Sequence, residues 1–186
     1  VIAQDDKASQ AYYFKGVAHL AKGEVQVARS AFNKAVELNP NDNRAKLVLA
    51  EIKLKERDFT GAEQDIKAVV SVLPDNYQAL LLLGKAFLGQ GKLDEAQKNF
   101  SRLIELQAQN PEGYYQRGIV WRLQKNSGAA MADFERALAL NPKLLDAFGQ
   151  VVGILASKKD FTAALARCDQ QLHGLKDSSF HQAFIM

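Results

Sequence analysis

The amino-acid sequence predicts an all-α fold, an α-solenoid in which helix-turn-helix units stack along the chain. The first observation is a repeated segment: ARSAFNKAVELNP at residues 28–40 recurs as AMADFERALALNP at residues 130–142. The two copies lie 102 residues apart, which is three times 34, and a fixed period of this size is typical of a stacked repeat array. The second observation is apolar residues at three-to-four spacing within one unit, which predicts amphipathic helices.

Residues of one kind recur at this step of 34 through the whole chain. Alanine does so without exception, at Ala28, Ala62, Ala96, Ala130 and Ala164. Four further series keep the same register: Gly16, Ala50, Gly84, Gly118 and Val152; Phe32, Ile66, Phe100, Phe134 and Cys168; Ala35, Val69, Leu103, Ala137 and Gln171; Pro40, Pro74, Ala108, Pro142 and Lys176. Because the series agree on one register, the sequence predicts five contiguous units. The small residues are expected where the two helices of a unit cross.

Start and stop signals place the helices within each unit. Gly23 lies between the two apolar runs of the first unit, where a helix end requires a residue that tolerates positive φ. Pro40 cannot continue a helix and disfavours helix in the residue before it. Asp58 and Asp160 stand where a side chain can cap a second helix. The helices are therefore predicted at residues 9–22, 25–38, 43–56, 59–72, 77–90, 93–106, 111–124, 127–140, 145–158 and 161–174.

These series resemble the tetratricopeptide repeat (TPR), whose 34-residue unit carries Gly or Ala at position 8, Ala at 20, Phe at 24, Ala at 27 and Pro at 32. The resemblance implies a right-handed α-solenoid. It covers residues 9–178 as units 9–42, 43–76, 77–110, 111–144 and 145–178, of which the last is degenerate. Residues 1–8 are expected to form a lead-in, and residues 179–186 match the start of a further helix. We therefore expect a fragment of a longer array.

Composition and charge narrow the classes of partner. The chain of 186 residues is 47% hydrophobic and 24% charged, which is typical of a folded globular protein. Its net charge of +3 is too small to indicate a nucleic-acid partner. No apolar run approaches the roughly 18 residues that a membrane span needs, so no membrane contact by this segment is expected. Cys168 is the single cysteine, which excludes an internal disulfide and leaves the redox compartment open.

No pattern in the sequence indicates catalysis, a cofactor or a metal. Phosphate-binding and nucleophile-elbow motifs are absent. His19, His173 and His181 have no partners at metal-ligand spacing. Cys168 replaces the aromatic residue of its series and is expected to be a buried thiol. The basic runs at 53–57 and 158–159 are interpreted as solvated helix ends, with contact to a phosphate or an acidic partner as the alternative. The prediction is a chain that is not an enzyme.

The resemblance implies that the first helix of each unit lines a concave groove through positions 2, 5, 9 and 12. Carried over, these positions give eight candidate partner-binding residues: Tyr13, Val17, Arg44, Glu51, Lys85, Tyr115, Ile119 and Arg122. Tyr13, Tyr115 and Arg122 are the expected anchors, since aromatic and arginine side chains dominate interface energetics. Leu47, Leu54, Leu81 and Leu88 either contact a partner or pack against neighbouring helices. The Lys and Asn clamp of chaperone-binding members is absent, and Gly149 and Gly153 leave bare backbone in the last unit.

The sequence thus predicts a non-catalytic scaffold that binds a peptide or helix of a partner protein in the groove. The repeats look most like those of bacterial members, similar to cell-envelope proteins and lipoproteins of exopolysaccharide secretion and protein sorting, or of pilus assembly. Periplasm, envelope and cytoplasm all remain open. Two alternatives are a self-assembling array, in which repeat ends stack into a homo-oligomer, and a regulatory module of a larger enzyme.

Overall fold

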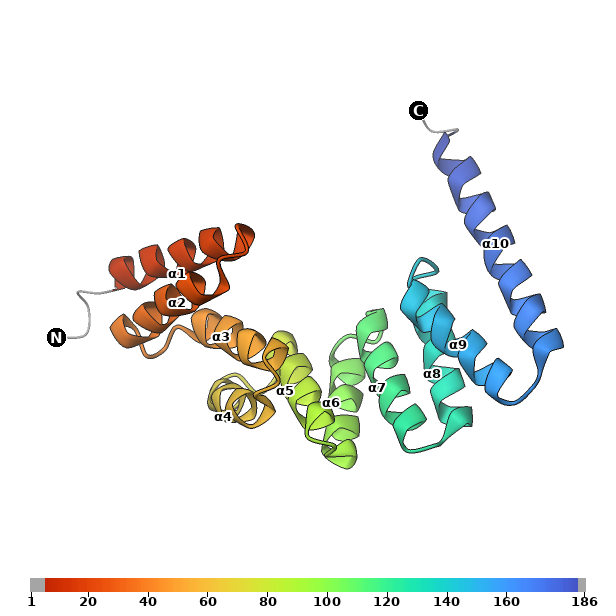
Figure 1. Cartoon of the computed structure of the whole chain (residues 1–186), viewed down its shortest axis with the longest axis horizontal. Helices are drawn as coiled ribbons and strands as arrows, with labels where there is room; N and C mark the ends of the chain where they lie inside the picture. The colour runs from red at the N-terminus through yellow and green to blue at the C-terminus, as the bar shows by residue number, and fades with distance from the viewer. Residues whose placement is uncertain (1–5, 184–186) are drawn as a thin grey trace. The chain divides into compact units, whose positions relative to one another are not determined.

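A computed structural model describes residues 6–183, and within this range the chain forms ten helices and no strand (Figure 1). The helices are α1 (Asp6–Ala21), α2 (Val25–Leu38), α3 (Asn43–Lys55), α4 (Phe59–Val70), α5 (Tyr77–Gly89), α6 (Leu93–Leu106), α7 (Pro111–Leu123), α8 (Ser127–Leu140), α9 (Leu145–Ser157) and α10 (Phe161–Ala183). The predicted all-α solenoid fold class is confirmed. The chain divides into two compact units, Val1–Asn99 and Phe100–Met186, which are described separately as the N-terminal unit and the C-terminal unit.

The last helix differs from the prediction. It was expected to end at residue 174, with a further helix beginning at 179, but α10 continues without a break from Phe161 to Ala183. Helices α2 and α8 end at Leu38 and Leu140, and their C-cap residues Asn39 and Asn141 are each followed by a proline. In α10 the proline is replaced by Lys176, so the backbone retains every amide donor that the helix needs. Residues 184–186 of the expected further helix lie outside the described range.

The first helix also differs at its start. It begins at Asp6, so residues 6–8 of the expected lead-in are helical, and residues 1–5 lie outside the described range. Two contacts tie this end of α1 to the end of α2. The Asn39 side-chain amide donates to an Asp6 carboxylate oxygen over 3.0 Å, and the buried Ser9 hydroxyl donates to the Ala35 carbonyl over 2.9 Å.

One residue in every inner turn has a left-handed backbone, and these residues recur at the step of 34. Gly23 has φ +78° and Gly91 has φ +74°. The other three are not glycine: Arg57 (φ +66°), Lys125 (φ +61°) and Lys159 (φ +60°). The conformation predicted at Gly23 is therefore confirmed. It is a property of the turn geometry that persists where the sequence lacks glycine.

Side-chain caps hold the helix starts as predicted. An Asp58 carboxylate oxygen accepts from the Gly61 amide over 2.9 Å, and Asp160 does the same with the Ala163 amide over 3.0 Å. Asp42, Asn76, Asn110 and Asn126 cap α3, α5, α7 and α8 in the same way. Each such cap satisfies one of the amides that a helix start leaves without an intrahelical partner.

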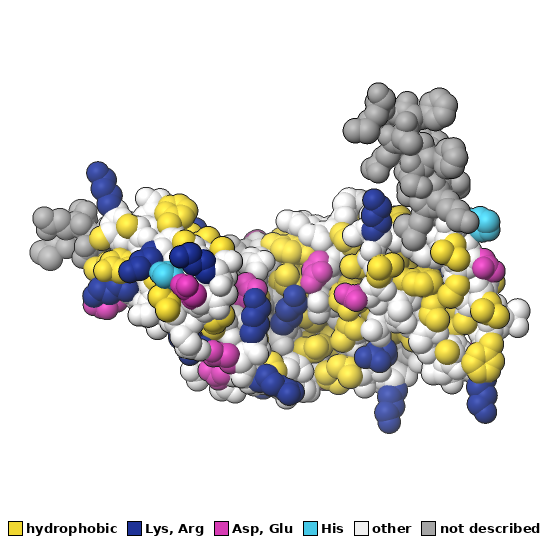
Figure 2. All heavy atoms as spheres, turned by 45° about the horizontal axis from the view of Figure 1, so that its top comes forward, with side chains coloured by type: hydrophobic (Ala, Val, Ile, Leu, Met, Phe, Trp, Pro, Cys, Tyr) yellow, Lys and Arg dark blue, Asp and Glu magenta, His cyan; other side chains and the backbone are white. Residues whose placement is uncertain are grey.

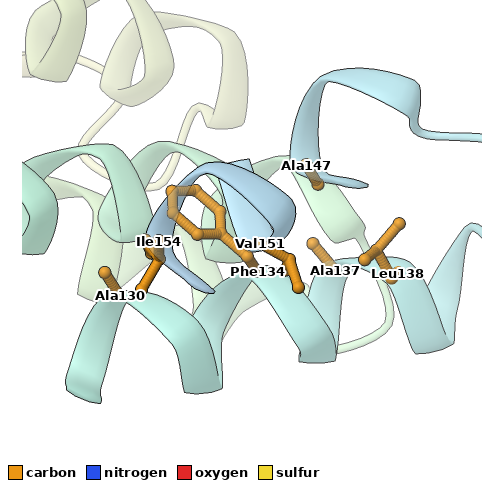
Figure 3. Close-up of a cluster of buried hydrophobic side chains, with 7 residues drawn as sticks. All are labelled: Ala130, Phe134, Ala137, Leu138, Ala147, Val151 and Ile154. Carbon is orange, nitrogen blue, oxygen red and sulfur yellow. The ribbon is translucent and has the colours of Figure 1, made fainter. Parts of the chain in front are cut away.

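In the first and fourth repeats the core is built where a glycine of the first helix receives an aromatic ring of the second. Phe32 is fully buried, and a Cβ added to Gly16 would lie 2.7 Å from its ring. The same contact recurs in the C-terminal unit, where a Cβ on Gly118 would lie 2.6 Å from the Phe134 ring. Phe134 forms one cluster with Ala130, Ala137, Leu138, Ala147, Val151 and Ile154, whose side chains face one another in Figure 3. The predicted helix crossing is confirmed.

Buried charges in both units are paired. In the N-terminal unit the buried Glu63 accepts from Lys67 at 2.6 Å, from Gln90 at 2.7 Å and from Lys92 at 2.9 Å. In the C-terminal unit the Arg117 guanidinium donates twice to the buried Asp133 carboxylate, over 2.8 Å each. These pairs tie helices together, because a buried carboxylate without such donors would be strongly destabilising.

Candidate partner-binding surface

In the N-terminal unit the structure brings together two of the predicted residues, Tyr13 of α1 and Arg44 of α3. The Arg44 guanidinium lies 4.7 Å from the centre of the Tyr13 ring, a distance at which a cation and an aromatic face attract. The opposite neighbours of the ring are Phe32, with ring centres 5.7 Å apart, and Phe14, at 5.5 Å. Tyr13 is therefore half-buried and held in place, and it presents Arg44 at the surface.

Two apolar side chains of α1 lie exposed beside this stack. Val17, a predicted residue, is 41% exposed, and Phe14 is 57% exposed. Phe14 was not among the eight candidates, because it occupies a unit position outside the groove pattern. The sequence signal that could have identified Phe14 is its position: it is a large aromatic residue next to Tyr13, and it does not belong to any of the repeated series that pack in the core. An open hollow of about 420 Å³ adjoins Arg44 and is lined by Asp6, Lys7, Ser9, Gln10, Asn39, Asn41, Asp42 and Asn43.

The remaining predicted residues of this unit, Glu51 and Lys85, are half-buried on α3 and α5, which are in direct contact. Glu51 pairs with Lys55 one turn away, at 3.4 Å. Leu47 and Leu81 are each only 9% exposed, which decides their open assignment in favour of packing between helices. Leu54 and Leu88 are half-buried, so their assignment stays open, and the exposed apolar side chains of this surface are Phe14 and Val17.

In the C-terminal unit the predicted residues Tyr115 and Ile119 of α7 pack against the cluster around Phe134. The Tyr115 and Phe134 ring centres lie 6.0 Å apart, and this contact repeats the Tyr13–Phe32 contact of the N-terminal unit. Both tyrosines are half-buried, and the ring of each packs against the buried phenylalanine of its repeat. The third predicted residue, Arg122, is exposed.

Charged side chains surround the Tyr115 hydroxyl. Burial raises the pKa of Tyr115, the carboxylates of Asp146 and Glu112 raise it further, and the Arg122 cation partly opposes them. The structure thus gathers Tyr115 and Arg122 with Asp146 of α9. Asp146 was absent from the candidate set, because its unit is the degenerate one. Asp146 holds position 2 of its 34-residue repeat, and in the N-terminal unit Arg44 holds position 2 of its repeat. The Tyr13 and Tyr115 sites therefore have neighbours of opposite charge.

The described residues contain no group of three or more His, Cys, Asp or Glu side chains that could hold a metal ion. The His19 ring contacts the Glu24 carboxylate, and Cys168 is half-buried rather than fully buried as predicted. Over the part of the chain that the structure describes, no helix has both the length and the apolar character to cross a membrane. In each unit Figure 2 shows hydrophobic side chains interspersed with charged ones, a surface suited to another protein.

Comparison with known proteins places the chain in a family. One family model described as Tetratricopeptide repeat matches residues 47–96 and 81–144, and another of the same description matches residues 9–42. DnaJ homolog subfamily C member 3 of Bos taurus is 28% identical over 153 residues, which are 82% of this chain and 27% of that protein. The chain thus spans about a quarter of that relative's length.

Two solved structures show the fold. That of PilF from Pseudomonas aeruginosa has a TM-score of 0.78 at 22% identity and covers 91% of this chain and 77% of PilF. That of YrrB, a TPR protein with an unusual peptide-binding site, has a TM-score of 0.68 at 22% identity and covers 83% of this chain and 76% of YrrB. With the family models, the repeat register and the helix crossings in agreement, the chain belongs to the tetratricopeptide repeat family, whose fold typically serves as a non-catalytic scaffold for protein–protein interaction.

Proposed function

We propose that this chain is a non-catalytic scaffold that binds a peptide or helix of a partner protein on the first helices of its units. The observation that carries the proposal is the Tyr13–Arg44 stack with Phe14 and Val17 exposed beside it. Exposed aromatic and apolar side chains next to a fixed arginine are the typical anchors of a protein interface. The stack is also preorganised, because the Tyr13 ring is already held by Phe32.

The chemistry of this surface indicates the kind of segment it binds. Phe14 and Val17 suit an apolar side chain, and Arg44 suits a carboxylate about one helical turn or two extended residues away. In the C-terminal unit Tyr115 lies among Asp146, Glu112 and Arg122, which suits a segment with a basic or amide side chain. YrrB, a member of the same fold, has a peptide-binding site, which supports the same use here.

The expected role in bacterial envelope secretion or assembly is part of this proposal. It is supported by the likeness to PilF, a type IV pilus assembly protein that is 23% identical over 164 residues. These residues are 86% of this chain and 64% of PilF. Fractionation of the source cells, followed by immunodetection of the chain, tests the compartment. Recovery in the cytoplasm alone would exclude an envelope role.

The binding surface is tested with peptides selected from a displayed random library against the 186-residue chain. The affinity of a selected peptide is then measured by titration calorimetry for Val17→Ser and for Phe14→Ser. Each substitution should weaken binding about tenfold, or about 1.4 kcal/mol, because it removes an apolar anchor. Arg44→Gln should weaken binding and reduce its salt dependence.

A matched control is available on the second helix of the same unit. Val27 of α2 is 47% exposed, close to the exposure of Val17, but lies outside the proposed surface. Val27→Ser should leave the affinity unchanged. The proposal fails if Val17→Ser and Val27→Ser have the same effect while both variants melt at the wild-type temperature.

A further inference from the structure

An apolar stripe runs along α10, the last helix of the C-terminal unit. Phe161 is 60% exposed, Leu165 is 67% exposed and Leu172 is 56% exposed. They are four and seven residues apart, which places them on one side of the helix. The exposed Asp169 follows Leu165 by one turn and borders the stripe. We call Phe161, Leu165, Asp169 and Leu172 the tail face.

At the equivalent positions of some earlier repeats the residue packs against the following repeat, although Val25, at the position of Phe161 in the first repeat, is itself 40% exposed. Leu138 lies 34 residues before Leu172, is 3% exposed and packs in one cluster with Ala147 of α9 (Figure 3). Phe59 lies 102 residues before Phe161, and its ring fills the space where a Cβ on Gly89 of α5 would sit. Glu63 lies 102 residues before Leu165 and bonds to Gln90 and Lys92 of the following unit. The tail face is therefore built to receive a first helix.

The complementary surface lies exposed on α1 of the N-terminal unit. Ala11 and Ala18 are exposed. The residues at their positions in the four later units are all buried: Ala45, Ala79, Gly113 and Ala147 for Ala11, and Ile52, Ala86, Val120 and Ile154 for Ala18. Lys15 is exposed between the two alanines. We call Ala11, Lys15, Ala18 and the exposed Ala21 the head face.

We propose that the tail face of one copy of this chain binds the head face of a second copy, in the geometry of the joints within the chain. Leu172 then packs on Ala11, as Leu138 packs with Ala147, with the same two residue types. Asp169 then lies beside Lys15. Ser101 of α6 holds the repeat position of Asp169, and Arg117 of α7 holds that of Lys15. At this joint within the chain the Arg117 guanidinium donates to the Ser101 hydroxyl over 3.2 Å. Phe161 and Ala21 occupy the repeat positions of Phe59 and Gly89, and because a Cβ at Gly89 would lie 2.4 Å from the Phe59 ring, the Phe161 ring must shift from the Phe59 arrangement to accommodate the Ala21 methyl group.

The two faces match in size and in charge. Large apolar side chains on α10 oppose alanines on α1, and an aspartate opposes a lysine. Pairing of two tail faces would instead place Asp169 beside its own copy and large side chains against large ones. The contact is therefore heterologous, with a different face of each copy on the two sides of the joint.

The first experiment is analytical ultracentrifugation of the 186-residue chain over a concentration series. The wild-type chain should increase in average mass with concentration. Leu172→Glu blocks the tail face, because its equivalent Leu138 is buried at the internal joint, and Ala18→Glu blocks the head face; each should weaken association at least tenfold. An equimolar mixture of the two variants should form a dimer and nothing larger, because each retains one intact face. Val72→Glu, at a residue 67% exposed in the turn after α4, should associate like the wild type.

A charge exchange provides the second experiment and does not depend on the glutamate variants. Asp169→Lys should weaken association, and adding Lys15→Asp to the same chain should restore it. The proposal is overturned if the wild-type chain stays monomeric, if the Ala18→Glu variant alone associates like the wild type, or if the double exchange restores nothing. Association by Ala18→Glu alone would indicate contact between two tail faces.

Discussion

At the scale of single residues, the left-handed position in each inner turn shows most directly how geometry overrides composition. The turn requires positive φ at one residue every 34, and the sequence supplies glycine at Gly23 and Gly91 but a long basic residue at Arg57, Lys125 and Lys159. A residue with a Cβ in this region clashes with the carbonyl that follows it, at a cost of roughly 1 kcal/mol. These three turns therefore hold stored strain that glycine would release.

Lys125→Gly should stabilise the chain by about 0.5 to 1 kcal/mol, because the gain in the turn exceeds the extra chain entropy that glycine loses on folding. Urea unfolding followed by circular dichroism measures this change. Lys125→Ala is the matched control. It removes the same side chain but keeps a Cβ, so no gain is expected. Equal stability of the glycine and alanine variants would show that the turn is not strained.

Glycines within the first helices of different 34-residue repeats have opposite roles. At Gly118 an added Cβ would lie 2.6 Å from the Phe134 ring, so the helix crossing depends on its absence. At Gly149 and Gly153 of α9 an added Cβ would meet no described atom within 4 Å. The sequence could place all three on a first helix, but only the structure distinguishes a packing contact from a degenerate position.

Gly149→Ala and Gly153→Ala should each stabilise the chain by about 1 kcal/mol, since alanine is the better helix former and has open space. Gly118→Ala should instead destabilise it by about 1 to 3 kcal/mol through overpacking against Phe134. Thermal melting of the three single variants compares the two effects directly. A loss of stability at Gly149 and Gly153 would mean that α9 has a close neighbour at this surface.

The candidate site was predicted in part from single residues. The unit positions identified Tyr13 with Arg44, and Tyr115 with Arg122, which the structure brings together in separate units. They also gave Asp146 as a groove position of the last repeat, although it was not among the eight candidates, and they did not identify Phe14, because a repeat pattern describes average members and not the particular side chains beside them. The packing of the two tyrosines also required coordinates, since ring contact with Phe32 and Phe134 depends on distance.

At the scale of helices, the ends follow from local signals wherever such signals exist. Asparagine and proline end α2 and α8, and aspartate caps start α4 and α10. The prediction for the end of α10 was wrong because it extended a repeat boundary into a segment without the stop residues. A repeat register predicts where a helix ought to end, but the backbone ends it only where a residue prevents continuation.

The joint between α4 and α5 depends on one carboxylate. Hydrogen bonds from Lys67, Lys92 and Gln90 lower the pKa of Glu63 from 4.5 to about 2. Because the folded-state pKa lies below the unfolded-state value, the ionised form stabilises the fold above pH 4.5. This contribution is lost as the pH falls from 4.5 through about 2.

Glu63→Gln should therefore flatten the acid side of the stability profile. Between pH 6 and pH 3 the wild type should lose about 1 to 2 kcal/mol more than the variant, a modest value because Lys67 and Lys92 are largely exposed. Urea unfolding at both pH values measures the difference. Glu37→Gln, at an exposed carboxylate on α2, should keep the wild-type profile. A Glu63→Gln profile parallel to the wild type would contradict this account.

At the scale of the whole molecule, a stacked array has no single core. Its stability is approximately the sum of the stabilities of the 34-residue repeats and of the joints between neighbouring repeats. The helix pair α9–α10 combines two weaknesses. It contains the exposed Gly149 and Gly153, and the tail face of α10 has no cover among the described residues. The pair α7–α8 in the same unit has the buried Phe134 contact instead.

Amide hydrogen exchange should therefore open α9 and α10 before α7 and α8. A difference of about 1 to 2 kcal/mol in opening free energy corresponds to exchange roughly 5 to 30 times faster. Mass spectrometry of proteolytic fragments measures this, with Leu172→Glu as the background so that association does not protect α10. Equal protection of the two pairs would show that the C-terminal unit opens cooperatively.

The sequence by itself determined the repeat period, the order of the helices and the small and aromatic residues at the helix crossings, but not the end of α10. These features depend on signals along the chain that the step of 34 repeats, and the same step brings residues of adjacent repeats, such as Phe134 and Ala147, into one core. Only the tertiary structure decided which tyrosine neighbours which charge, which glycine is packed and which faces of α1 and α10 remain exposed. These features depend on distances between side chains of different helices, and a linear pattern does not contain such distances.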